Sequence, residues 1–370
     1  MNVFGVGGRF LRSVGLLAIS LSLLTACVST PSKSTDTAGK NKFRLLWPAP
    51  PDQPRFAFQT QLNSVADIVR ESDEKRMERM LTGQAVNDKP VIEKPSGIVA
   101  RGGRVYVAEP AAKGVTVFDV PRRKIFRFGQ REPNNLEKPQ SIAIDEQGRV
   151  YVLDSKLRRV MVFDGLGLFD YSIAVDRGFT NPVAVAVSAD GQTVYVVDRG
   201  DVATDDHKVV AFSPDGKERF RLGPRGSAEG RFNIPLAAGT GPDGSLYVVD
   251  SGNFRVQVFD ADGKFRSSFG GLGSEIGKFS RPRAIALDRE GNVYVADAAF
   301  NNIQIFDPKG QLLMPLGMLS REAGPGHYSL LAGITVDERG FLYVVDHYFK
   351  KIEVFRRLSD EEGRKLIPVK

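Results

Sequence analysis

Six acidic residues are the first candidates for chemistry, because each one ends the same kind of short apolar segment. The segment reads Val-Tyr-Val-x-Asp or a close variant, and it recurs about every 45 residues. The six acids are Glu109, Asp154, Asp198, Asp250, Asp297 and Asp346. A ring of carboxylates could hold a hard cation such as calcium. We favour the alternative that each acid accepts hydrogen bonds from its own loop, because repetition in every unit marks a rule of construction.

Histidine and cysteine offer little further chemistry. Of the three histidines, His207 and His347 lie three repeats apart, so we do not expect them to share an ion. His327 could approach His347, and together with Asp346 they form the candidate ligands for one calcium or zinc ion. Otherwise we expect no cofactor, and we expect the histidines to be exposed loop residues. The single cysteine, Cys27, excludes an intramolecular disulfide and a cysteine-based zinc or iron–sulfur site.

Seven basic residues lie in segments that differ from one repeat to the next. They are Arg131, Arg225, Arg231, Lys278, Arg281, Arg283 and Arg321. Functional residues should break a repeat, so we expect these seven to share one face and to bind an acidic partner there. Glutamates lie among them, and a merely solvated charged surface is the alternative. Residues 199–208, which lengthen the third repeat, are the other irregular stretch.

One glycine-rich segment imitates a nucleotide-binding motif. Gly239-Thr240-Gly241-Pro242-Asp243-Gly244 matches G-x-G-x-x-G, but a strand pattern follows it at residues 245–249. No helix N-terminus is therefore present to hold a pyrophosphate, and we predict a hairpin turn. The chain contains no G-x-S-x-G, H-E-x-x-H or P-loop motif, which argues against the corresponding hydrolase and nucleotidase families.

Six internal repeats must position all of these residues. They start at Pro95, Pro139, Pro182, Pro235, Pro282 and Leu331. Each repeat holds a short apolar strand, a turn, the segment that ends in an acid, an alternating strand, a second turn and a fourth strand. Such short links permit only hairpins, so each repeat is a four-stranded antiparallel sheet. We predict an all-β fold, a six-bladed β-propeller over residues 95–358.

The fourth repeat shows the pattern most fully, with Asp250-Ser251-Gly252-Asn253-Phe254-Arg255 followed by Phe259-Asp260. In these residues it resembles the NHL repeat, and the resemblance spans residues 95–355. A WD40 repeat is disfavoured because the only tryptophan, Trp47, lies outside the repeats. Propellers similar to NHL proteins include a lyase with a metal at the ring centre. The resemblance therefore implies an alternative function, a metal-dependent lyase or lactonase with its ion at the channel mouth.

The last repeat lacks its fourth strand, because Phe355 runs into a charged tail at residues 359–370. Residues 54–62, near the other end of the chain, alternate between apolar and polar side chains. We expect them to form a strand that completes the last blade and hides two sheet edges.

One helix is expected within residues 45–94, after the closing strand. Residues 64–67 resemble a capping box, and apolar residues follow at helical spacing until Gly83. We predict an amphipathic helix that packs on the propeller.

The amino terminus resembles the export signal of bacterial lipoproteins. Arg9 and Arg12 precede an apolar run at residues 14–24, which is too short for an ordinary membrane-spanning helix. The run leads into Leu-Thr-Ala-Cys, which resembles a lipobox. We therefore predict that residues 1–26 are removed and that Cys27 is lipidated.

The residues after Cys27 bear on location. Val28 stands where an aspartate commonly retains lipoproteins in the inner membrane, which implies the outer membrane of a Gram-negative cell, facing the periplasm. Residues 27–44 then form a flexible tether rich in serine, threonine and lysine. Loss of the signal removes two arginines and no acid, so the net charge falls from +7 to +5. This mild basicity, together with export, argues against nucleic acid as a partner.

These features predict a membrane-bound envelope protein that uses the loop-rich face of its propeller to bind a protein or an acidic glycan or lipid. We expect no catalysis of its own. The metal-dependent lyase or lactonase is the alternative, and a structural cap in a multi-protein envelope complex is a third class.

Overall fold

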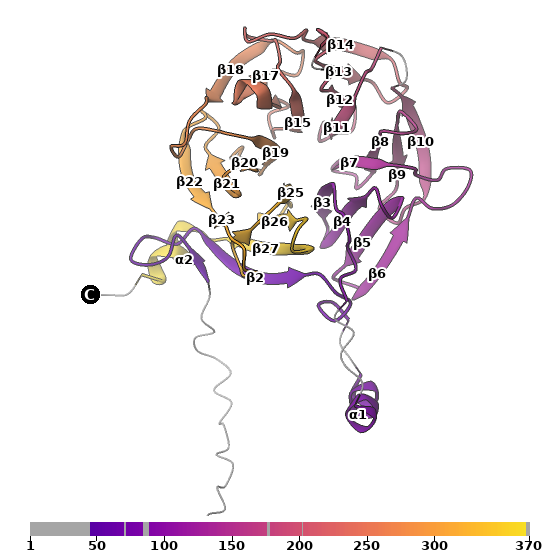
Figure 1. Cartoon of the computed structure of the whole chain (residues 1–370), viewed down its shortest axis with the longest axis vertical. Helices are drawn as coiled ribbons and strands as arrows, with labels where there is room; N and C mark the ends of the chain where they lie inside the picture. The colour runs from indigo at the N-terminus through magenta and orange to yellow at the C-terminus, as the bar shows by residue number, and fades with distance from the viewer. Residues whose placement is uncertain (1–44, 70–71, 84–88, 176–177, 202, 368–370) are drawn as a thin grey trace, which may run out of the picture. The chain divides into compact units, whose positions relative to one another are not determined.

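Six antiparallel sheets surround a central channel (Figure 1). The structure is a computed structural model, and it describes residues 45–69, 72–83, 89–175, 178–201 and 203–367. The innermost strands of neighbouring sheets contact one another all the way round, so the ring is closed. The predicted all-β, six-bladed propeller is confirmed. The predicted signal peptide, Cys27 and the tether lie outside the described residues.

Blades 1 to 5 are four-stranded, and their strands follow the chain from the channel outward. Blade 1 contains β3 (Gly97–Arg101), β4 (Arg104–Glu109), β5 (Gly114–Asp119) and β6 (Lys124–Phe128). Blade 2 contains β7 (Pro139–Ile144), β8 (Val150–Asp154), β9 (Arg159–Phe163) and β10 (Phe169–Ala174). Blade 3 contains β11 (Pro182–Val187), β12 (Val194–Asp198), β13 (Lys208–Phe212) and β14 (Glu218–Leu222).

The next two blades keep the same order. Blade 4 contains β15 (Pro235–Thr240), β16 (Leu246–Asp250), β17 (Arg255–Phe259) and β18 (Phe265–Gly270), with a short 3-10 helix at Ser251–Asn253. Blade 5 contains β19 (Pro282–Leu287), β20 (Val293–Asp297), β21 (Asn302–Phe306) and β22 (Leu312–Leu316). The link to blade 6 holds the short parallel pair β23 (Met318–Leu319) and β24 (His327–Tyr328). The glycine-rich segment after Thr240 is the hairpin turn between β15 and β16, as predicted.

Blade 6 is completed by a strand from the other end of the chain, as predicted. Its sheet has the order β1 (Leu46–Trp47), β2 (Phe56–Leu62), β27 (Lys351–Arg357), β26 (Phe341–Asp346) and β25 (Leu331–Val336). Figure 1 shows β2 along the outer side of β27, and the two strands pair antiparallel from Phe56 opposite Arg357 to Leu62 opposite Ile352. The fifth strand, β1, is not predicted, because two residues carry no recognisable alternation.

One hydrophobic core lies between each pair of neighbouring blades, which gives six cores around the channel. The alternation of side chains along each strand explains this arrangement, because successive residues face opposite neighbours. On β8, Val150 and Val152 belong to the core shared with blade 1, whereas Tyr151 and Leu153 belong to the core shared with blade 3. The whole ring therefore depends on contacts between blades.

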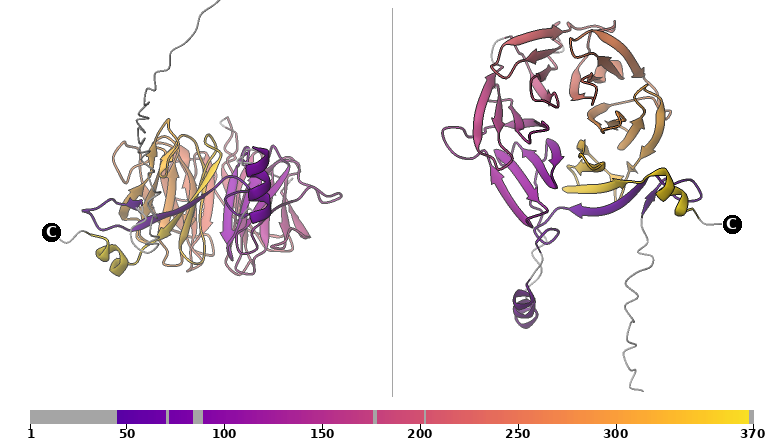
Figure 2. Two further views of the ribbon diagram at one scale, coloured as in Figure 1. Left: turned by 90° about the horizontal axis from the view of Figure 1, so that it is seen from below. Right: turned by 180° about the vertical axis from the view of Figure 1, so that it is seen from behind.

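The predicted amino-terminal helix is shorter than expected and does not pack on the propeller. It is α1 (Asp73–Thr82), which is capped by the Ser72 side chain and ends at Gly83 in the left-handed conformation. None of its residues is buried, so the predicted packing is wrong. Figure 2 shows α1 standing beside the blades.

The capping-box pattern upstream of α1 forms a turn instead of a helix start. The Asp67 carboxylate accepts hydrogen bonds from the backbone N–H groups of Asn63 and Ser64, both at 2.7 Å. The side chain thus closes a local turn, which an aspartate can stabilise as well as it can a helix terminus.

A second helix, α2 (Asp360–Lys365), forms in the charged tail. Ser359 and Glu362 make a reciprocal capping box at its start. Gly363 is buried beneath the carbonyl oxygen of Pro54, which fastens the tail to the segment before β2. In the described part of the chain, neither helix is long and apolar enough to span a membrane.

Candidate functional site

The acids that end the second strands are fully buried and serve their own loops. Asp154 accepts hydrogen bonds from the backbone N–H groups of Glu137 and Lys138 at 2.6 and 2.8 Å. It also accepts from Lys156 and Leu157 at 3.0 and 2.9 Å. Aspartates in the other blades repeat this arrangement. These acids therefore hold the loops of one face in place, as the structural interpretation predicts.

The three candidate metal ligands are not brought together. Among the residues that the structure describes, no set of three or more His, Cys, Asp or Glu side chains could hold a metal ion. His327, His347 and Asp346 therefore do not form a metal site. Asp346 is fully buried and accepts hydrogen bonds from the backbone of Ser329 and Leu330 at 2.7 and 2.9 Å. Its oxygens are already occupied by the loop that enters blade 6.

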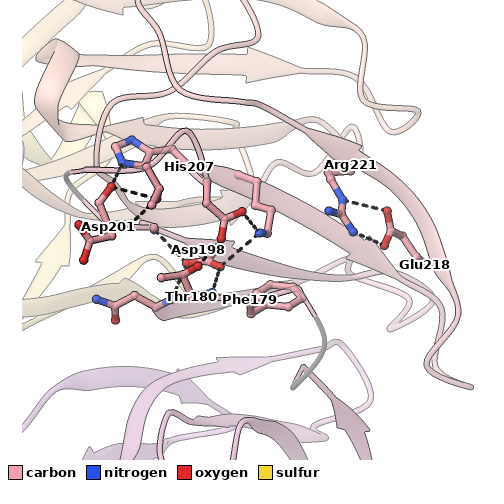
Figure 3. Close-up of polar contacts among 12 residues, drawn as sticks. Phe179, Thr180, Asp198, Asp201, His207, Glu218 and Arg221 are labelled. Atoms are coloured by element: carbon pink, nitrogen blue, oxygen red, sulfur yellow. Dashed lines mark hydrogen bonds and ion pairs between the residues drawn. The ribbon is translucent and has the colours of Figure 1, made fainter.

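His207 is fully buried, whereas the sequence predicts an exposed loop histidine. Its Nδ1 accepts a hydrogen bond from the Ile234 backbone at 3.0 Å, and its Nε2 lies 3.1 Å from the carbonyl oxygen of Asp201 (Figure 3). This pattern requires a neutral ring with its proton on Nε2. His207 thus fastens the long loop of blade 3 to the start of blade 4, and its role is structural.

The charges at the end of the long blade 3 loop are also satisfied within the protein. Lys208 is buried, pairs with Asp198 at 3.5 Å and with Asp206, and lies 5.3 Å from the centre of the Phe179 ring. Burial opposes ionisation of Asp206, but its hydrogen bonds with Lys208 and Thr180 outweigh this effect and lower its pKa. Figure 3 shows Asp198, Thr180 and Phe179 close to one another in this region. The contacts at the end of this loop therefore indicate a structural role for the irregular stretch at residues 199–208.

The channel has a volume of about 580 Å³ and is lined by the six inner strands. Five of these strands carry a β-bulge near their first residue, and a bulge leaves one residue unpaired and re-aims its side chain. We call the bulged residues, together with Ser96 of blade 1, the mouth ring. It consists of Ser96, Gln140, Val183, Leu236, Arg283 and Ala332, all of which line the channel. In the sequence these positions follow the repeated Pro or its equivalent and vary from blade to blade.

Arg283 is the only charged member of the mouth ring. Arg281 and Arg199 line the channel at the same end, where the inner strands begin. Within the described residues, the side chains of Arg281 and Arg283 have no acidic partner. Solvent reaches Arg283, yet burial against the channel wall, and then the like charge of Arg281, lower its pKa. An anion placed here would relieve that repulsion.

The opposite end of the channel has mixed charge. Glu146 and Glu338 line it together with Arg101 and Arg289. The unopposed positive charge is therefore confined to the loop face, where the field of the mouth can attract an acidic group.

The other five predicted basic residues are distributed around the loop face. Arg131, Arg231, Lys278 and Arg321 are exposed, and Arg225 is half-buried. Arg231 donates to the carbonyl oxygen of Arg225 at 3.4 Å, and Lys278 donates to that of Gly270 at 3.2 Å. Of the seven predicted basic residues, all of which the structure describes, only Arg281 and Arg283 line the channel.

Four basic residues that the sequence does not single out line a second cleft, between blades 2 and 3. They are Lys138, Lys156, Arg158 and Arg199, and the cleft has a volume of about 520 Å³. No signal within one repeat selects them, because they come from three separate segments. In each blade, the link between the second and third strands lies on the same face as the inter-blade segments. Applying this rule to the sequence could have placed the four basic residues together.

Comparison with known proteins supports the fold. A model of the NHL repeat matches residues 232–259, so the prediction that blade 4 carries the repeat most fully is confirmed. A search of curated proteins gives no match.

Several solved structures share the architecture. A protein of unknown function from Bacteroides thetaiotaomicron is 15% identical, with 80% of this chain and 76% of that chain covered and a TM-score of 0.58. A streptogramin B lyase is 12% identical, with 72% and 94% covered and a TM-score of 0.53. A gluconolactonase from Xanthomonas campestris is 16% identical, with 72% and 87% covered and a TM-score of 0.52. At these identities the likeness concerns the fold alone.

Proposed function

We propose that this NHL-repeat propeller is a lipid-anchored binding protein of the bacterial cell envelope, and that its loop face captures an acidic segment of a partner protein at the channel mouth. The observation that carries the proposal is the pair Arg281 and Arg283, two like charges that have no acidic partner among the described residues. Leaving two such charges against a channel wall is unfavourable unless an anion offsets them. A carboxylate-rich segment would do so.

Charge reversal at the channel mouth tests the proposal. We expect the double variant Arg281→Glu, Arg283→Glu to lose recovery of the partner in pull-downs from envelope extracts, because the mouth would then repel an acidic segment. The melting temperature should stay nearly unchanged, since exposed charges contribute little to stability. Rising salt should weaken recovery by the unmodified protein.

A matched control reverses two lysines on the opposite face. Lys264 and Lys309 are exposed in the turns before the outermost strands of blades 4 and 5. The double variant Lys264→Glu, Lys309→Glu makes the same change in net charge and should recover the partner normally. Undiminished recovery by the mouth variant, or equal loss in both variants, would count against the channel mouth as the site.

The anchor has a separate test. If Cys27 carries the lipid, Cys27→Ser should move the protein from the membrane fraction to the soluble fraction, because acyl chains supply membrane affinity of about 0.8 kcal/mol per buried methylene group. Ser29→Ala, two residues along the tether, should leave the protein in the membrane fraction. Membrane association that survives Cys27→Ser would rule out this anchor.

A further inference from the structure

The cleft between blades 2 and 3 lies on the loop face, beside the channel mouth. Gln140, Val183 and Arg199 line both the cleft and the channel, so the two spaces adjoin. With a volume of about 520 Å³, the cleft falls within the range of small-molecule sites.

The lining of the cleft is strongly basic, and no carboxylate among the described residues contributes to it. Lys138 is exposed, and its ammonium group has no partner among the described residues. Arg199 is held by a neutral group: with the Asn181 side-chain amide assigned so that its oxygen faces the guanidinium, this oxygen accepts from Nε at 2.8 Å and from Nη2 at 3.1 Å. Lys156 alone is paired, with Glu137 at 3.0 Å. The cleft therefore keeps a surplus of positive charge.

Arg158 adds a donor that no described residue satisfies. Its Nη2 donates to the carbonyl oxygen of Phe179, whereas its Nε is buried and has no hydrogen-bond partner. Buried polar groups nearly always have a partner, and a charged donor without one is costly. An oxygen atom of a bound anion would supply the missing acceptor.

The ring acid of blade 2 fixes the basic groups in place. Asp154 accepts hydrogen bonds from the backbone of Lys138 and Lys156, both of which line the cleft. These two segments are therefore held in position before any ligand arrives, which lowers the entropic cost of binding.

We propose that this cleft binds a phosphate monoester carried by a molecule of about the size of a sugar. Guanidinium and ammonium groups suit a dianionic phosphate, and the arginines can each donate two hydrogen bonds. The cleft is larger than a bare phosphate needs, so the group to which the phosphate is attached would fill the rest. A soluble sugar phosphate and a lipid headgroup share this chemistry. The site deepens the proposed function, since it rests on the loop face being a binding face.

Calorimetric titration of the purified full-length protein tests the cleft and separates the two sources. The probes are glucose 6-phosphate and dihexanoyl phosphatidic acid, with glucose and dihexanoyl phosphatidylcholine as counterparts that lack a phosphate monoester. We expect binding of at least one phosphate monoester and none of either counterpart. Binding of glucose 6-phosphate alone would identify a soluble ligand, and binding of the phosphatidic acid alone a lipid headgroup. Binding of neither, or equal binding of the counterparts, would overturn the proposal.

Variants place the binding in the cleft. Lys138→Ala removes a side chain without partners and should weaken binding about tenfold or more, as expected for a hydrogen bond between charged groups. Arg158→Lys keeps the charge but removes the unsatisfied Nε, and it should also weaken binding. Lys309→Ala, on the opposite face, is the control and should bind normally. Unchanged affinity in Lys138→Ala and Arg158→Lys would overturn the assignment.

The two proposals can fail independently. The variant Arg281→Glu, Arg283→Glu should still bind the phosphate probe, because neither residue lines the cleft. The protein could fail to bind the phosphate probe while partner recovery still depends on Arg281 and Arg283. That result would reject the cleft as a site but would leave the proposed site at the channel mouth intact.

Discussion

Deletion of residues 45–62 is expected to lower the melting temperature by about 10 °C or more, or to prevent folding altogether. The deletion removes β2, whose Phe56 and Leu62 are buried in the cores on either side of blade 6 and whose Ala57 is also buried. It also leaves β27 as an unpaired edge. The measurement is thermal unfolding followed by circular dichroism, with size-exclusion chromatography to detect association through the exposed edge.

Two comparisons make this result specific. Deletion of the tether residues 28–41 should leave the melting temperature unchanged, so equal melting temperatures for the two deletions would refute the closure. Because the larger deletion removes many residues, Phe56→Ala provides a milder change, with an expected loss of about 3–5 kcal/mol. Gln59→Ala, at an exposed position on the same strand, should have little effect.

Removal of a ring acid is expected to cause the second large loss. Asp154→Ala leaves four backbone N–H groups without their acceptor, and we expect the free energy of unfolding to fall by about 3–5 kcal/mol. Asp154→Asn keeps one acceptor oxygen and should lose less. Chemical denaturation of the purified variants measures both.

The controls separate a structural acid from a metal ligand. Asp262→Ala, in an exposed turn, should change the stability by less than about 0.5 kcal/mol. A chelator should leave the melting temperature of the unmodified protein unchanged. If the chelator destabilised the unmodified protein as much as Asp154→Ala does, the acids would be holding an ion and the structural interpretation would be wrong.

Repetition made most of the fold predictable. One blade pattern, read six times, specifies four strands, their order and the hairpins between them, because short links leave a strand no other neighbour. The gap at Phe355 then identifies the closing strand, since an alternating segment elsewhere must cover the open edge. The predicted helix start at residues 64–67 is wrong because the local sequence pattern is compatible with two structures. Asp67 caps a turn in the structure, and the sequence pattern for that turn is the same as for a helix start.

The candidate site was less predictable, because it depends on side-chain direction. Arg281 and Arg283 are recognisable as departures from the repeat, but the position of Arg283 at the channel follows from the bulge in β19. The cleft needs three segments to converge, and Lys138, Arg158 and Arg199 do so only when blades 2 and 3 are side by side. Such proximity is a property of the ring and is absent from any single repeat.

The pairing of β2 with β27 has a consequence for the order in which the molecule can be completed. Gln53 and Asp360, which meet beside this pairing, are 307 positions apart in the chain. β2 is synthesised early but can pair only after β27 has been synthesised near the end of the chain, and bringing such distant segments together is slow. While the chain emerges from the ribosome, the growing arc of blades exposes an apolar sheet face at each end, and β2 has no strand to pair with. Newly made chains would be open to association through these faces and through β2 for the whole of synthesis, and a chaperone that shields them would protect the chain until the sixth blade is made.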